Sequence, residues 1–212
     1  MTDRQYALNA RFVTQSLTGI QRYCYELTMR LQNARLLAPS PALEAYEGVQ
    51  ARVNVTGGYL GGHPWEQFVL PLAISRRQAL FSPAGCGPLA HVNQVLTIHD
   101  LAPLENPEWY SRGFALWYSH LVPTLARRVR CIVTVSEFCK QRIVELLRVD
   151  ERKVTVAWEG ASSTFPPAPP MKCKRHSTAS GFKSHTSCSL VRCQGGRIYL
   201  GFCWHGVESS IS

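Results

Sequence analysis

The chain has 212 residues, 45% of them hydrophobic and 17% charged, and a formal net charge of +9. This composition excludes a low-complexity or collagen-like chain and suits one globular domain of good size. No apolar run approaches the roughly 20 residues that span a bilayer, and the N-terminal MTDRQYALNA lacks the charged-then-apolar pattern of an export signal. We therefore expect a cytoplasmic protein, whose mildly basic body is compatible with peripheral contact with the anionic inner membrane.

Seven short apolar runs predict β-strands, at 6–8, 35–37, 51–55, 79–81, 95–98, 131–135 and 154–158. Helices are expected between them, from Ile20 onward, at 64–74, at 108–128 and after Ser136. Strands that alternate with helices are typical of an α/β fold with a parallel sheet. The expected fold class is therefore α/β, with a Rossmann-like doubly wound parallel sheet and an irregular C-terminal tail.

Apolar spacing also predicts which helix faces are buried. One face of the helix at 64–74 should carry Trp65, Phe68, Val69 and Leu72, and Pro71 should kink or break it. One side of the helix at 108–128 should carry Phe114, Trp117, Leu121 and Leu125. Aromatic residues in this region, such as Trp109 and Trp117, could hold a sugar or lipid, although aromatics at helical spacing usually belong to the core.

Polar residues lie at the ends of two predicted strands and at the start of the first predicted helix. His99-Asp100 follows the strand at 95–98, Ser136-Glu137 follows the strand at 131–135, and Thr18-Gly19 precedes the first helix. Parallel strands bring their carboxyl ends to one edge, where doubly wound domains bind ligands. His99 could instead fill a turn, Asp100 could cap one, and Ser136 is favoured as a helix N-cap. Thr18-Gly19 predicts an anion site only weakly, since most glycines before helices simply make turns.

The sequence changes in character after the proline-rich PPAPP at 166–170. From Met171 onward there are six Lys or Arg and one acid, Glu208, with no helical or strand-like period of useful length except at 197–202. Four cysteines and three histidines lie here: Cys173, Cys188, Cys193, Cys203, His176, His185 and His205. No CxxC or HxxxH pair supports zinc, and no recognisable module supports nucleic-acid binding. We expect residues 168–212 to be an irregular, non-native or disordered tail that binds neither.

Five stretches together resemble the N-terminal half of a glycosyltransferase family 4 (group 1) enzyme, nearest to bacterial mannosyltransferase-like members. They are NARFVTQSLTGIQRYCYEL at 9–27, FSPAGCGPL at 81–89, VLTIHDLAPLENPEWYS at 95–111, IVTVSEFCKQRIVELLRVDERKVTVAWEG at 132–160 and TFPP at 164–167. The resemblance implies a GT-B architecture, with two Rossmann-like domains facing across a cleft, in which residues 1–167 are the acceptor-side domain. It implies sugar transfer with retention and no metal or cofactor, the nucleotide-sugar donor being a substrate.

The resemblance also assigns roles by position. His99 and Asp100 match the family's His-Asp pair at the cleft, where the His bonds the transferring sugar. Thr18 and Gly19 match the first loop beside the donor diphosphate and the acceptor, and Ser136 and Glu137 begin a segment lining the same edge. The expected partners are a nucleotide-sugar and a glycan or lipid-linked acceptor, as in lipopolysaccharide or other surface polysaccharide synthesis.

The residues after 167 depart from the family pattern, because the glutamate pair of the donor-binding domain is missing. The first hypothesis is therefore a truncated retaining glycosyltransferase that is inactive alone. The second is a non-catalytic acceptor-binding remnant, and the third is a basic metal- or nucleic-acid-binding protein that acts through its tail.

Overall fold

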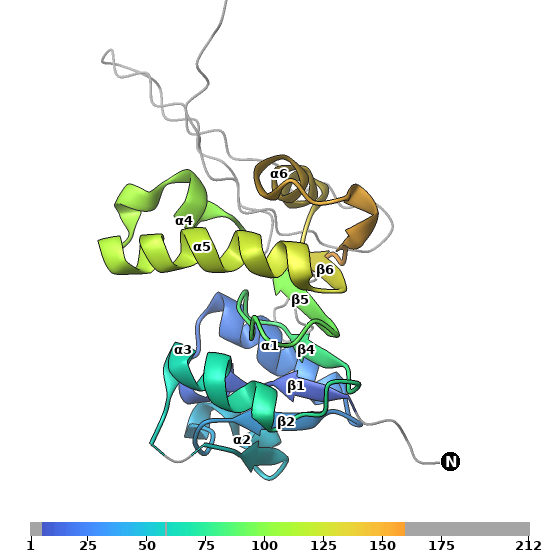
Figure 1. The fold of residues 1–212 in the computed structure, drawn as a ribbon. Helices are drawn as coiled ribbons and strands as arrows, with labels where there is room; N and C mark the ends of the chain where they lie inside the picture. Colours follow the sequence, from blue (N-terminus) through green and yellow to red (C-terminus); the bar gives the residue numbers. More distant parts are fainter. Residues whose placement is uncertain (1–5, 58, 160–212) are drawn as a thin grey trace, which may run out of the picture. The chain divides into compact units, whose positions relative to one another are not determined.

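A computed structural model of the chain describes residues 6–57 and 59–159. Contacts divide the chain into two units at Trp158, and all described residues except Glu159 lie in the first. Seven parallel strands form one sheet in the order β3-β2-β1-β4-β5-β6-β7 (Figure 1). They are β1 Ala7–Asn9, β2 Arg35–Ala38, β3 Val53–Val55, β4 Leu80–Ser82, β5 Gln94–Ile98, β6 Cys131–Thr134 and β7 Val154–Val156. The predicted Rossmann-like α/β sheet is confirmed.

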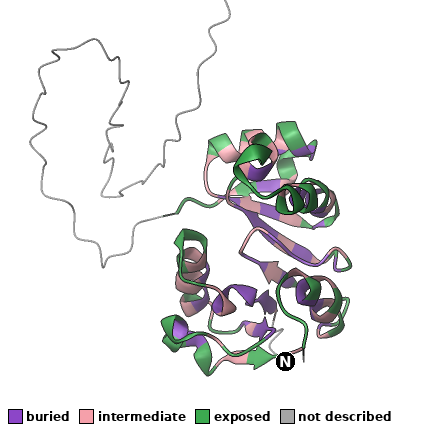
Figure 2. Cartoon of the chain, turned by 90° about the vertical axis from the view of Figure 1, so that its left-hand side faces the viewer, coloured by how far each residue is buried: buried purple, intermediate pink, exposed green. Residues whose placement is uncertain are grey.

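Helices cover both faces of this sheet. Leu8 of β1 packs on the side of α1 (Gly19–Arg30) and α2 (Glu47–Gln50), whereas its neighbour Ala7 packs with Trp65 on the other side. Leu80 packs with Trp65 on this second side and pairs in register with Gln94, so Leu96, two residues further along β5, points to the same side. Leu96 packs with α5 (Arg112–Arg128) and α6 (Glu137–Leu147), which therefore cover the second side as well. Figure 2 shows buried residues along the strands and exposed ones on the outer sides of the helices.

The strand order reverses between β1 and β4. The chain steps outward from β1 to β2 and β3, then crosses back to β4 and steps the other way to β7. In open α/β sheets the crevice beyond the carboxyl ends of the strands at such a reversal is where ligands bind. Residues after β1 and after β4 are therefore those that the fold offers to a ligand. None of the described helices is both long and apolar enough to cross a bilayer.

The helix predicted at 64–74 is irregular, and its predicted face is confirmed for Trp65 and Val69 but wrong for Phe68 and Leu72. The segment winds as α3 (Gly62–Pro64), a π-helical stretch (Trp65–Val69) and a 3-10 turn (Leu70–Leu72). Pro71 has no N–H to donate and its ring crowds the carbonyl of Gln67, so the chain cannot keep the α-helical ladder there. Trp65 is fully buried, whereas Phe68 and Leu72 are 69% and 87% exposed.

The helix predicted at 108–128 begins four residues later than expected. Residues Pro107–Trp109 form a separate 3-10 turn, and Ser111 caps α5 by accepting a hydrogen bond from the backbone N–H of Phe114. Leu121 and Leu125 are buried as predicted, but Phe114 and Trp117 of the first turns are 37% and 40% exposed. The predictions for residues 168–212, including the strand at 197–202 and the metal alternative, lie outside the described residues.

Gly87 offers a test of the packing beside β4. A Cβ at this buried position would collide with the Oε1 atom of Gln94, whose side chain is buried and hydrogen-bonded to Ser82. We expect Gly87→Ala to lower the free energy of unfolding by about 1–3 kcal/mol, as overpacking does, in urea titrations followed by tryptophan fluorescence. A Cβ at Gly113 meets nothing within 4 Å in the first turn of α5, so Gly113→Ala should be neutral or stabilising. Equal effects of the two substitutions would contradict this packing.

Candidate functional site at the carboxyl edge

The predicted site residues lie at one edge of the sheet. His99 and Asp100 follow β5 directly, Ser136 follows β6, and Gly19 begins the helix that follows β1. Because these strands are parallel, their carboxyl ends share one edge, as the sequence predicted. This placement is confirmed, whereas the roles of the residues stay predictions.

His99 joins three segments of the edge. Its ring atom Nε2 lies 2.9 Å from the carbonyl oxygen of Pro83, in the loop after β4, and its ring stands edge-on to Tyr23 of α1 at 4.9 Å between centroids. The thiol of Cys139, in α6, reaches the backbone oxygen of His99 at 3.3 Å. Since a carbonyl only accepts hydrogen bonds, Nε2 donates. The imidazole is thus half-buried and held in one orientation at the centre of the edge.

Asp100 is exposed, and its carboxylate closes a turn. Oδ1 accepts a hydrogen bond from the backbone N–H of Ala102 at 3.0 Å, at the start of α4 (Ala102–Glu105). The backbone oxygen of Asp100 lies 3.4 Å from the Tyr118 hydroxyl. The turn-capping role considered for this residue is therefore present.

Thr18 and Gly19 open α1 without a side-chain cap. The hydroxyl of Thr18 donates to Oε1 of Gln21 rather than accepting from a backbone N–H, and no acidic residue occupies the first turn. Gly19 has room for a side chain, since a Cβ there would meet nothing within 4 Å. The free N–H groups and positive end of this helix therefore face outward, which is the arrangement that binds anions.

Ser136 and Glu137 open α6 differently. The Ser136 hydroxyl accepts a hydrogen bond from the backbone N–H of Cys139 at 3.1 Å, so Ser136 is the N-cap that the sequence favoured. Glu137 is exposed in the first turn, where its charge offsets the helix dipole. This helix start is therefore better suited to hydroxyl groups than to a phosphate.

Sequence reasoning missed a buried carboxylate at the reversal of strand order. Glu66 is 1% exposed. Its Oε1 accepts from Nδ2 of Asn9 at 2.6 Å and from Nε of Arg11 at 3.4 Å, and its Oε2 lies 3.2 Å from Nδ1 of His63. Burial alone raises the pKa of Glu66, but the His63 hydrogen bond, the Arg11 cation and the Asn9 hydrogen bond outweigh it and leave that pKa below its usual value. Glu66 is thus an ionised, fully satisfied group.

Cys86, in the loop after β4, interacts electrostatically with both Glu66 and Tyr118. Burial, and then the charge of Glu66, raise the pKa of the Cys86 thiol to about 12. Burial, with Cys86 and Asp100 nearby, also raises the pKa of Tyr118. Polar groups after β1, β4 and β5 therefore influence one another electrostatically across the edge.

Among the described residues, one group of potential metal ligands lies within this network. The ligand atoms of His63, Glu66 and Cys86 all lie within 4.8 Å of one another. An ion there would have to displace the proton of a buried thiol and sit beside the Arg11 cation, which already pairs with Glu66 at 3.4 Å. The charge distribution therefore suits a hydrogen-bonded carboxylate better than a metal centre.

The comparison with protein families identifies the family of the chain. The family model described as Glycosyltransferase Family 4 matches residues 17–162, which include α1, the His99-Asp100 turn and α6. The chain belongs to glycosyltransferase family 4. No curated protein and no solved structure matches the chain significantly.

The buried Glu66 of this family 4 chain is difficult to recognise from the sequence. Glu66 lies between Trp65 and Phe68 in a segment whose period is broken, and acidic residues in helices are usually solvated. The one available signal is Asn9 at the end of the first strand, because a buried amide needs a polar partner.

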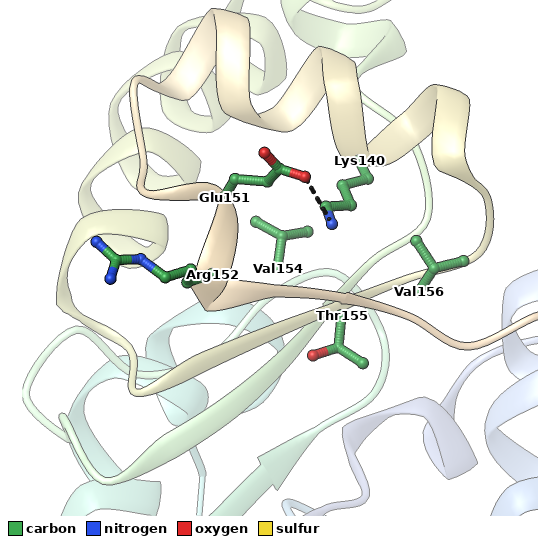
Figure 3. A pocket seen from close by; sticks show the side chains of 6 residues that line it. All are labelled: Lys140, Glu151, Arg152, Val154, Thr155 and Val156. Carbon is green, nitrogen blue, oxygen red and sulfur yellow. Dashed lines mark ion pairs between the residues drawn. The ribbon is translucent and has the colours of Figure 1, made fainter.

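An open depression at the last strand of the family 4 domain is unrelated to this edge chemistry. Figure 3 shows it between α6 and β7, lined by Lys140, Glu151, Arg152 and Val154–Val156. The Lys140–Glu151 ion pair measures 3.0 Å, and Glu151 is 71% exposed. Such an exposed pair contributes little to stability, and none of the predicted site residues lines the depression.

Removing the charge of Glu66 should destabilise the chain strongly. We expect Glu66→Gln to cost roughly 3–5 kcal/mol at neutral pH, because Arg11 keeps a nearly buried charge without its partner. Since folding lowers the pKa of Glu66, its stabilisation is present above the unfolded pKa of about 4.3 and is lost as pH falls through the folded pKa. The difference between wild type and variant should therefore shrink below about pH 4 in urea unfolding measured across pH.

Glu26→Gln provides the control for this experiment. Glu26 is one-third exposed and pairs along α1 with Arg22 and Arg30, so its loss should cost less than about 1 kcal/mol. A loss for Glu66→Gln as small as that for Glu26→Gln would contradict the buried network.

Proposed function

We propose that the chain acts in sugar transfer, as the acceptor-side domain of a retaining glycosyltransferase. The reaction moves a hexosyl group, with mannosyl as the leading candidate, from a nucleotide-sugar to a growing surface polysaccharide or lipopolysaccharide acceptor. Family 4 membership supports the reaction class. The observation that carries the proposal is the convergence of Tyr23, Pro83 and Cys139 on His99 at the carboxyl edge.

The roles of the edge residues follow from their contacts. His99, held by the Pro83 carbonyl, hydrogen-bonds the sugar being transferred. The outward N–H groups beside Thr18 and Gly19 approach the donor diphosphate and the acceptor. Asp100 and Ser136-Glu137 line the acceptor path and meet hydroxyl groups of the glycan. The proposal includes no metal or separate cofactor, and the nucleotide-sugar donor is a substrate.

The proposal leaves donor recognition to a second domain, as the GT-B architecture implies. Transfer requires the diphosphate to be held and its growing charge to be stabilised in a closed, water-poor cleft. Residues 6–159 supply one wall of that cleft. The residues after Pro170 carry Glu208 as their only acid, so they lack the glutamate pair of a donor domain.

We expect the chain by itself to show no steady sugar transfer. Positioning of the two substrates can contribute roughly 7–11 kcal/mol to lowering the barrier, and most of that depends on the opposite wall. The measurement combines calorimetry and a transfer assay on the full chain, with a panel of nucleotide-sugars and bacterial lipid-linked acceptors. The expected result is acceptor binding without turnover. Tight donor binding or steady turnover would overturn the acceptor-side assignment.

The role of His99 can be tested in a two-domain relative of the family that carries the same His-Asp pair. Replacing the His at the matching position by Ala should lower kcat by about 10²-fold or more, as loss of one hydrogen bond formed in the transition state does. Cys139 is a poor control, because its thiol contacts the backbone of His99. The position matching Cys131, at the opposite end of β6, should tolerate Ala. An unchanged kcat in the His variant would remove His99 from the site.

A further inference from the structure

The imidazole of His63 is held on one side and open on the other. Nδ1 lies 3.2 Å from Oε2 of Glu66, and the side chain is 31% exposed. A carboxylate only accepts hydrogen bonds, so Nδ1 must carry the hydrogen. In the neutral ring this leaves the lone pair on Nε2, which makes no hydrogen bond with the described residues. In its neutral form, His63 therefore presents an oriented hydrogen-bond acceptor on the side away from Glu66.

The orientation of His63 is fixed by groups that cannot move away. The Glu66 carboxylate is 1% exposed and is bonded at its other oxygen to Asn9 and Arg11. The carboxylate therefore keeps its charge and its position when Nε2 of His63 gains a ligand. A buried carboxylate that sets the tautomer of an imidazole is a general way of preparing the far nitrogen for a ligand.

Trp117 supplies an apolar surface beside this acceptor. Its ring centroid lies 5.9 Å from that of His63, with 56° between the planes, and the residue is 40% exposed. Trp117 belongs to the second turn of α5, and His63 belongs to α3, which follows β3. Both belong to connections that leave the carboxyl edge, α3 after β3, and α5 after β5 by way of α4 and a 3-10 turn. Tyr110 and Phe114 contact each other at 5.5 Å between centroids, and Phe114 precedes Trp117 by three residues on α5.

This pairing matches the chemistry of a sugar ring. A pyranose has faces made partly of C–H groups, which pack against an aromatic ring, and a rim of hydroxyls that donate hydrogen bonds. A half-exposed indole also loses apolar contact with water when such a face covers it. A phosphate would not use this pair, because the lone pair on Nε2 of the neutral ring offers no hydrogen and repels an anion. A metal ion would find only one ligand here, Nε2, because the indole is no ligand.

We propose that His63 and Trp117 form an acceptor-sugar subsite of this domain. Nε2 of His63 accepts a hydrogen bond from a hydroxyl of the acceptor glycan, the indole of Trp117 packs on the same sugar ring, and Glu66 is a positioning residue. The inference rests on the proposed acceptor-side function and adds the residues that recognise the glycan. It assigns these residues to sugar binding rather than to the step in which the bond is formed.

The test is an NMR titration of the full chain labelled with ¹⁵N-histidine. The probes are the methyl glycosides of mannose, glucose, galactose and rhamnose at millimolar concentration. We expect free His63 to be the Nδ1–H tautomer, and the Nε2 resonance to shift when a binding glycoside is added. His63→Phe keeps a ring but removes the acceptor, so it should weaken glycoside binding by about five- to tenfold. Trp117→Ala should weaken it by about tenfold, whether followed by ligand or protein resonances.

Two matched variants control for general effects on α5. His120 is exposed on that helix and bonds the Leu116 carbonyl, and Leu116 is 63% exposed beside Trp117. His120→Phe and Leu116→Ala should leave glycoside binding unchanged. Glycoside binding that survives in both His63→Phe and Trp117→Ala overturns the subsite while leaving the acceptor-side function intact. A wild-type chain that binds none of the glycosides overturns both the subsite and the acceptor-side function. An Nε2–H tautomer at His63 overturns the subsite alone.

Discussion

The buried carboxylate of Glu66 ties the crossover between β3 and β4 to the end of β1 at the carboxyl edge of the sheet. It belongs to the crossover between β3 and β4, yet it bonds Asn9 at the end of β1 and Arg11 just beyond. An ionised carboxylate without partners in the interior would cost several kcal/mol. The crossover must therefore place Glu66 where these donors meet, and this requirement sets the position of the polypeptide over the strand reversal.

The next residue, Gln67, extends the same constraint to the loop after β4. Its Nε2 donates to the Gly87 carbonyl at 2.8 Å, and its Oε1 accepts from the Leu89 N–H at 3.0 Å. This loop also contains Pro83, whose carbonyl holds His99. One irregular helical segment thus fixes both sides of the crevice, through Glu66 toward β1 and through Gln67 toward β4. The π-helical stretch that contains both residues is a local departure from the α-helix of the kind often found at functional sites.

The sequence predicts the sheet and part of the edge for a physical reason. Buried parallel strands are short apolar runs, so all seven were recognisable within one or two residues, and His99 was found because it ends such a run. The helix faces were less predictable where an apolar period coincides with an exposed surface, as at Phe68 and Trp117. Glu66 and His63 were missed because burial of a charge depends on Asn9 and Arg11, which are more than 50 residues away along the chain. No local pattern contains that information.

Charge divides the carboxyl edge into two chemically different parts. The Glu66 charge would repel a diphosphate if it were unpaired, but Arg11 pairs with it and both groups are nearly buried. The positive end of α1 has no acid in its first turn and no side-chain cap, so it keeps its attraction for an anion. The start of α6, by contrast, is capped by Ser136 and carries Glu137. Anionic groups therefore favour the Gly19 side of His99, and uncharged hydroxyl groups favour the start of α6.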